Sequence, residues 1–121
     1  MTTTTEMLQE ILENLKNLGS IEACAIASRD GLLMSSDMPE GIMGETFAAM
    51  SATMLGAAET AASELNKGLP SRVIVESKSG KLICMGAGPK ALLVAMTEHD
   101  TGLGLILLEL DKAVASIKEI I

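Results

Sequence analysis

A long helix without a charged face, in the middle of the chain, is the feature that most constrains the fold. The segment from Ile42 to about Asn66 runs without a turn signal and is closed before Pro70. Thirteen consecutive residues between Glu45 and Glu59 carry no charge. A surface helix normally keeps one charged face, and this segment lacks one. We therefore expect its outer side to be covered, either by the chain itself or by another protein.

The side chains of this helix divide into a bulky face and a small face. The bulky residues follow the spacing of one helix face and are predicted to press on a sheet: Met43, Phe47, Met50, Met54, Ala58, Ala61 and Leu65. The opposite, outer strip is small and nearly apolar at Ala48, Ala49, Ala52, Gly56 and Ser63, and with Glu45 and Glu59 it is the predicted protein-interaction site. A glycine in mid-helix costs roughly 1 kcal/mol relative to alanine, so we expect close packing to offset Gly56.

Two interpretations of the outer strip follow from the sequence. Either the helix is buried within one chain, with small residues selected for helix propensity, or it presents a protein-binding face. A domain of 121 residues has little material left to cover an outer helix. Exposed apolar strips usually mark interfaces, and this favours the binding face.

The segments before this helix read as a helix and a hairpin. Apolar residues at helical spacing mark a first helix, with Thr3 and Glu6 as a capping box and Gly19 as a C-terminal cap: Met7, Leu8, Ile11, Leu12, Leu15 and Leu18. Residues 21–28 and 32–36 flank Asp30-Gly31, which predicts a β-hairpin.

The segments after the long helix read as three strands and a helix. Residues 72–78 and 81–86 flank Ser79-Gly80 and predict a second hairpin. Residues 91–97 are apolar on both pleat faces, so this strand must be covered on both sides. Residues 103–121 have helical spacing, although 103–108 could instead form a strand.

The predicted order is α-β-β-α-β-β-β-α within one domain, residues 1–121. Hairpin connections at two joins favour an antiparallel arrangement. The fold class is therefore α+β, with a five-stranded antiparallel sheet and helices on both faces.

Composition excludes some classes of partner and places the chain in one compartment. The chain has one Phe, no Trp and no Tyr, and its net charge is -7. Without aromatic platforms or excess positive charge, nucleic acid is a poor partner. Cys24 and Cys84 lie in apolar runs, typical of buried reduced thiols rather than a disulfide. No signal peptide and no membrane-spanning run is evident, so we expect a cytoplasmic protein without direct membrane insertion.

No constellation of residues predicts an active site. His99, between Glu98 and Asp100, could join them around a metal, but three consecutive loop residues more simply form a solvated helix entrance. No feature activates either cysteine as a nucleophile beside His99. Residues 86–90 are glycine-rich, but neither their spacing nor the strand after them fits a phosphate-binding loop. We therefore predict no catalytic, cofactor-binding or metal-binding residue, and no enzyme.

Four segments in this order resemble one family. They are Ala-Ile-Ala-Ser-Arg-Asp-Gly-Leu-Leu at 25–33, the Ala- and Met-rich second helix, Arg-Val-Ile-Val-Glu at 72–76, and Leu-Gly-Leu at 103–105. Together they resemble the Roadblock / dynein light chain superfamily, particularly its prokaryotic single-domain members. The resemblance implies a homodimer whose second helices lie side by side. It also implies that the third strands pair edge to edge into one sheet, through Arg72, Val73, Ile74, Val75 and Glu76.

The resemblance also implies a function. Members of the superfamily regulate or scaffold small Ras-like GTPases, and one bacterial branch stimulates hydrolysis by its partner GTPase in gliding motility. The only arginines are Arg29, in a predicted turn, and Arg72, at a predicted strand start. Both fit structural or surface roles better than an arginine finger, so stimulation would act by repositioning residues of the GTPase. The alternative is a structural adaptor subunit of a larger motor-like or membrane-tethered complex, without effect on nucleotide state.

Overall fold

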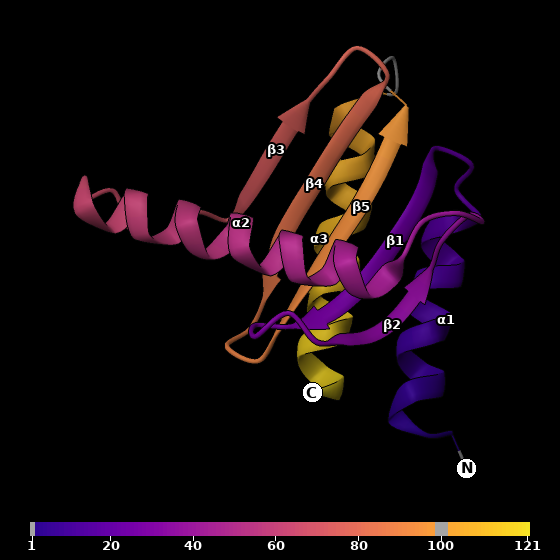
Figure 1. Cartoon of the computed structure of the whole chain (residues 1–121). Coiled ribbons are helices and arrows are strands. Elements are labelled where there is room, and N and C mark those ends of the chain that lie inside the picture. The colour runs from indigo at the N-terminus through magenta and orange to yellow at the C-terminus, as the bar shows by residue number, and fades with distance from the viewer. Residues whose placement is uncertain (1, 99–101) are drawn as a thin grey trace.

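The predicted order of elements is confirmed in the computed structural model, which describes residues 2–98 and 102–121 (Figure 1). Three helices and five strands follow one another: α1 (Thr4–Lys16), β1 (Ile21–Ser28), β2 (Leu33–Asp37), α2 (Gly44–Glu64), β3 (Arg72–Glu76), β4 (Gly80–Ala87), β5 (Ala91–Glu98) and α3 (Leu103–Ile120). Residues 103–108, whose sequence is compatible with helix or strand, begin α3. Among the described residues, no helix is long and apolar enough to cross a bilayer.

The five strands form one antiparallel sheet in the order β2-β1-β5-β4-β3. Strand β5 lies at its centre and is buried on both faces, as its continuous apolar sequence predicts. Strands β3 and β2 form the two edges. The two edges differ, because the register of β2 with β1 breaks at a bulge between Ile26 and Ala27.

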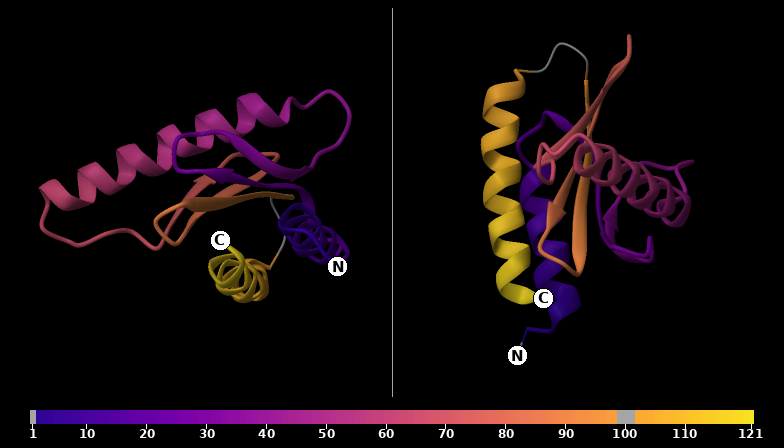
Figure 2. Two further views of the ribbon diagram at one scale, coloured as in Figure 1. Left: turned by 90° about the horizontal axis from the view of Figure 1, so that it is seen from below. Right: turned by 90° about the vertical axis from the view of Figure 1, so that its left-hand side faces the viewer.

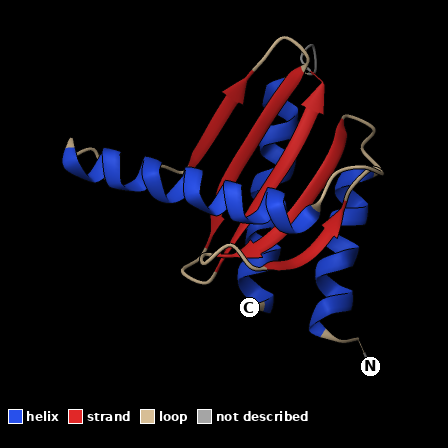
Figure 3. Ribbon diagram, in the orientation of Figure 1, coloured by secondary structure: helices blue, strands red, loops and turns tan. Residues whose placement is uncertain are grey.

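Helices cover both faces of the sheet. Figure 2 shows α1 and α3 side by side on one face and α2 alone on the other, and Figure 3 shows the same layers by element type. Each layer has its own apolar cluster. Leu12, Leu93 and Leu110 belong to the cluster between the sheet and α1/α3, whereas Leu55, Leu92 and Val94 belong to the cluster under α2.

Helix α2 meets the sheet through small residues, which corrects the predicted orientation. Its buried residues are Gly44, Ala48, Ser51 and Leu55. The predicted bulky face does not press on the sheet as a whole. Met43, Met50 and Leu65 are about two-thirds exposed and Ala61 is exposed, whereas Phe47, Met54 and Ala58 are half-buried. Small side chains let the helix axis approach the strands closely, and larger ones would hold it away.

Two local features predicted from the sequence are present in the structure, one at the start of α1 and one in the β1–β2 turn. Thr3 caps α1 by accepting a hydrogen bond from the backbone N–H of Glu6 at 3.1 Å. Gly31, in the β1–β2 turn, is buried with φ +88°. A Cβ there would lie 3.0 Å from the Cα of Ala49. The turn therefore needs glycine both for its conformation and for the close approach of α2.

Both cysteines are free and buried, as predicted. The Cys24 thiol donates to the carbonyl of Leu12 and the Cys84 thiol to that of Ser51. Burial raises the pKa of Cys24 to about 12, with a further contribution from Asp37. Burial likewise raises the pKa of Cys84 to about 11.

These pKa shifts predict a loss of stability at alkaline pH. Above the ordinary thiol pKa of 9.0 the unfolded chain ionises its cysteines while the folded chain keeps them protonated. The unfolded state then binds fewer protons, so the free energy of unfolding falls as pH rises from 9.0 through about 12. Urea unfolding across this range should show the decline. The double variant Cys24→Ala, Cys84→Ala should decline less steeply, and equal slopes would contradict the assignment.

Candidate protein-interaction surface

The exposed side of α2 is a long uncharged surface, which we call the α2 outer face. Its residues are Thr46, Ala49, Met50, Thr53, Gly56, Ala57, Thr60 and Ala61, all of them exposed. Met50 is 65% exposed, a large value for an apolar side chain. The helix also extends past β3 at the edge of the sheet (Figure 1). The chain therefore leaves uncovered the helix that is poorest in charge.

The threonines on this face do not restore its polarity. The hydroxyl of Thr53 donates to the carbonyl of Ala49 at 3.0 Å, and that of Thr60 to the carbonyl of Gly56 at 3.0 Å. Hydroxyls that bond back to the preceding turn of a helix have their donor already satisfied. The surface offered to a partner consists largely of methyl groups and backbone.

The predicted outer strip is only partly on this face. Glu45, Ala49, Gly56 and Ser63 are exposed, and Ala52 is half-buried beneath the β1–β2 turn. The prediction is wrong for Ala48, which is fully buried against the sheet. Glu59 is half-buried. Six residues of the face lie outside that strip and were missed: Thr46, Met50, Thr53, Ala57, Thr60 and Ala61.

A sequence signal for the correct orientation exists. Gly44, Ala48, Ser51 and Leu55 also follow the spacing of one helix face. Their small size suggests an outer position, whereas in the structure it is what permits contact with the sheet.

Arg29 connects α2 with the β4–β5 turn of the sheet. It follows β1, and its Nη1 lies 3.2 Å from both carboxylate oxygens of Glu59. Its Nε and Nη2 donate to the carbonyl of Gly88 at 3.2 and 2.9 Å. The guanidinium lies over Gly86, where a Cβ would collide with it. Arg29 thus joins α2, the end of β1 and the β4–β5 turn.

Strand β3 has one free edge and two different faces. Its residues are those of the predicted dimer edge, Arg72 to Glu76, and only β4 pairs with it among the described strands. Arg72 Nη2 lies 3.2 Å from Asp111 Oδ1 of α3. Ile74 packs against the cluster under α1 and α3, and Val73 against the cluster under α2. Neighbouring residues of β3 therefore face opposite layers.

A largely apolar hollow lies between the first half of α2 and the end of β3. It has a volume of about 410 Å³. Phe47 of α2 and Val75 of β3 line it together with Leu82 and Met96. The hollow thus brings α2 and the end of β3 together at Phe47 and Val75.

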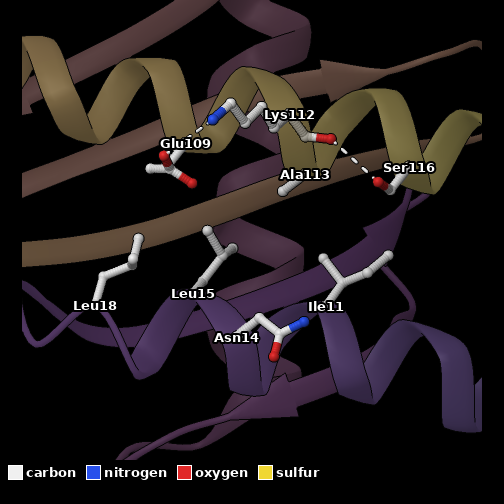
Figure 4. Close-up of a pocket in the computed structure, with 8 residues that line it drawn as sticks. All are labelled: Ile11, Asn14, Leu15, Leu18, Glu109, Lys112, Ala113 and Ser116. Atoms are coloured by element: carbon white, nitrogen blue, oxygen red, sulfur yellow. Dashed lines mark hydrogen bonds and ion pairs between the residues drawn. The ribbon is translucent and has the colours of Figure 1, made fainter.

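A second cavity lies between α1 and α3 (Figure 4) and has a volume of about 150 Å³. Its lining is Ile11, Asn14, Leu15, Leu18, Glu109, Lys112, Ala113 and Ser116. Lys112 is paired with Glu109 at 3.3 Å, and the Ser116 hydroxyl donates to the carbonyl of Lys112. These groups already have partners within α3, so the cavity offers little to a polar ligand.

The described part of the chain contains no group of three His, Cys, Asp or Glu residues placed to hold a metal ion. Of the trio predicted as a helix entrance, Glu98 ends β5, while His99 and Asp100 lie outside the described residues. Of residues 86–90, Gly86 and Ala87 end β4 and residues 88–90 form the β4–β5 turn, which leads into a strand and not a helix.

Removing the Arg29 contacts should destabilise the fold. Arg29→Ala leaves Glu59 and the Gly88 carbonyl without their partner, and we expect a loss of about 1–3 kcal/mol in the free energy of unfolding. Lys112→Ala breaks a more exposed ion pair within α3 and should cost less than about 1 kcal/mol. Urea unfolding of both variants measures the difference. Equal losses would mean that Arg29 contributes no more than a surface ion pair.

Comparison with known proteins identifies the family. The model of the Roadblock/LC7 domain matches residues 7–97. Uncharacterized protein MJ1340 of Methanocaldococcus jannaschii is 30% identical over 112 residues, which cover 93% of this chain and 97% of that protein. The structure of Myxococcus xanthus MglB has a TM-score of 0.88 at 20% identity, covering 96% of this chain and 88% of its own.

The gliding protein MglB of Thermus thermophilus also has a TM-score of 0.88, at 21% identity, covering 99% of this chain and 92% of its own. These structures share the α-β-β-α-β-β-β-α fold described above. The match to the family model extends from α1 through β5 and includes α2 and β3. The chain belongs to the Roadblock/LC7 domain family.

Proposed function

We propose that this protein is a non-enzymatic, homodimeric regulator or scaffold that binds a small Ras-like GTPase in the cytoplasm. The observation that carries the proposal is the α2 outer face, an exposed helix surface with no charge from Thr46 to Ala58. A contact function needs such a surface and no dedicated chemical group. Exposed apolar surface of this extent is typical of binding sites.

The neighbouring sheet edge supports the homodimer. An edge strand with unpaired backbone groups is a template for pairing with another chain. Strand β3 offers such an edge, the hollow at Phe47 and Val75 lies beside it, and α2 extends beyond it (Figure 1). A second copy joined here would continue the sheet and receive the protruding end of α2.

A GTPase partner is supported by family membership and by the likeness to MglB structures, one of which is named as a gliding protein. Neither arginine is free to act as a finger. Arg29 is bonded to Glu59 and Gly88, and Arg72 to Asp111. Any stimulation of hydrolysis would therefore act through residues of the GTPase itself.

A second candidate is a structural adaptor subunit of a larger motor-like or membrane-tethered complex. One observation favours it. Leu105 is 69% exposed and Leu108 51% exposed on α3, in the layer opposite α2. A second apolar surface on the far side of the sheet suits a subunit that bridges two neighbours.

The nucleotide dependence of binding separates the two candidates. The immobilised protein is exposed to native lysate with a GTP analogue or with GDP, and the retained proteins are identified. A Ras-like GTPase retained with the analogue alone supports the regulator. The same set of partners with either nucleotide supports the adaptor.

A charge on the α2 outer face should weaken this binding. Ala57→Lys places a cation in the middle of the uncharged surface without touching the core, because Ala57 is exposed. We expect at least about tenfold weaker capture, since burying an unpaired charge is costly. Ala115→Lys is the matched control, because Ala115 is an exposed alanine of α3. Undiminished capture by a folded Ala57→Lys protein would exclude this face as the binding surface.

A further inference from the structure

The sequence of β3 is symmetric in its apolar residues about Ile74 and carries opposite charges at its two ends. It reads Arg72, Val73, Ile74, Val75, Glu76: a cation, a β-branched residue, a central isoleucine, a β-branched residue and an anion. A two-fold interface uses the same patch on both subunits, so the patch must be complementary to itself. A strand with opposite charges at equal distances from its centre meets this condition when paired antiparallel with its own copy.

We infer that two copies join through β3 in a single register, with the two-fold axis at Ile74. In this register Arg72 lies opposite Glu76 of the partner subunit, and Val73 lies opposite Val75 of the partner subunit. The inference rests on the proposed homodimer and specifies its geometry. All five residues of the strand are paired, and each end of the ladder holds one pair of opposite charges.

Neighbouring registers lose these pairs. An axis at Val75 sets Arg72 against Lys78 of the partner subunit, and like charges directly opposite are destabilising. An axis at Val73 sets Glu76 against Pro70 of the partner subunit, which has no N–H for the ladder. Charge and hydrogen bonding both favour the axis at Ile74.

The contacts within one chain leave the required groups available. Arg72 and Ile74 face α3, where Arg72 uses Nη2 to reach Asp111. Its Nε is buried and has no hydrogen-bond partner among the described residues. Glu76 is exposed and belongs to no ion pair in the described ranges. The carboxylate of Glu76 from a second copy would give the guanidinium a further acceptor.

The joined β3 ladder would have two different faces, one on the α3 side of the sheet and one on the α2 side. On the α3 side, paired Ile74 side chains lie between two ion pairs. On the α2 side, Val73 and Val75 form an apolar continuation of the hollow at Phe47. Each face of the new ladder thus matches the layer that it extends.

Charge reversal tests the register. Arg72→Glu gives a strand with two acidic ends, and Glu76→Arg gives one with two basic ends. Each variant alone should form a homodimer at least about tenfold weaker than that of the wild type, measured by sedimentation equilibrium. An equimolar mixture of the two should restore a dimer of wild-type affinity, because every end pair is again of opposite charge. Failure of the mixture to dimerise better than either variant would overturn the register.

Disulfide trapping tests it independently of the ion pair to Asp111. Ile74→Cys should cross-link with itself, because residues on the axis lie opposite each other at a separation that a disulfide spans. Val73→Cys and Val75→Cys should each cross-link poorly alone and efficiently as a mixture. The native thiols do not compete, because Cys24 and Cys84 are buried.

The outcomes separate the register from the proposed homodimer. Efficient cross-linking of Val73→Cys or Val75→Cys with itself, in a protein whose wild type is dimeric, overturns the axis at Ile74 and leaves the homodimer standing. A wild-type chain that sediments as a monomer at all concentrations overturns both.

Discussion

The burial of β5 on both faces is the constraint on which the rest of the structure depends. Leu92 and Val94 point into the cluster under α2, and Leu93 and Ala95 into the cluster under α1 and α3. A strand that is apolar on both sides is stable only between two layers. The single helix α2 must therefore provide all the helical cover on one face, while two helices share the other. Because α2 makes this contact with Gly44, Ala48, Ser51 and Leu55, its other side is left to face outward.

The order and type of the elements could be predicted from the sequence because each is marked by local chemistry. The cap at Thr3, the turn at Asp30-Gly31 and the double-sided strand 91–97 all act over a few residues. The orientation of α2 could not be predicted in the same way. Large apolar side chains are expected to be buried and small ones exposed, which would place Met50 inward and Ala48 outward. In the structure Met50 is exposed and Ala48 is buried. Which face of a helix is buried depends on how close the helix approaches the sheet, and this is a property of the whole layer.

The candidate surface was harder to predict than the fold, because contact surfaces lack the fixed spacings of catalytic motifs. The β3 edge could be located, since its β-branched residues mark a strand and the resemblance to the Roadblock / dynein light chain superfamily implies that this strand lies at the margin. The role of Glu59 could not, because its partner Arg29 lies 30 residues away in sequence. Only the fold brings β1, α2 and the β4–β5 turn to one point. Glu59, a polar residue of the predicted interaction site, is thus used by Arg29 to hold α2 in place.

The difference between the two edges of the sheet sets a limit on assembly. Strand β3 is regular along its whole length, whereas β2 adjoins a bulge that disturbs the ladder at the opposite margin. Bulges and short strands are among the devices by which natural sheets avoid adding further strands. A sheet with two regular margins could grow without end into a fibre. A sheet with one regular margin can be extended once at that margin, and after the addition no regular margin is left.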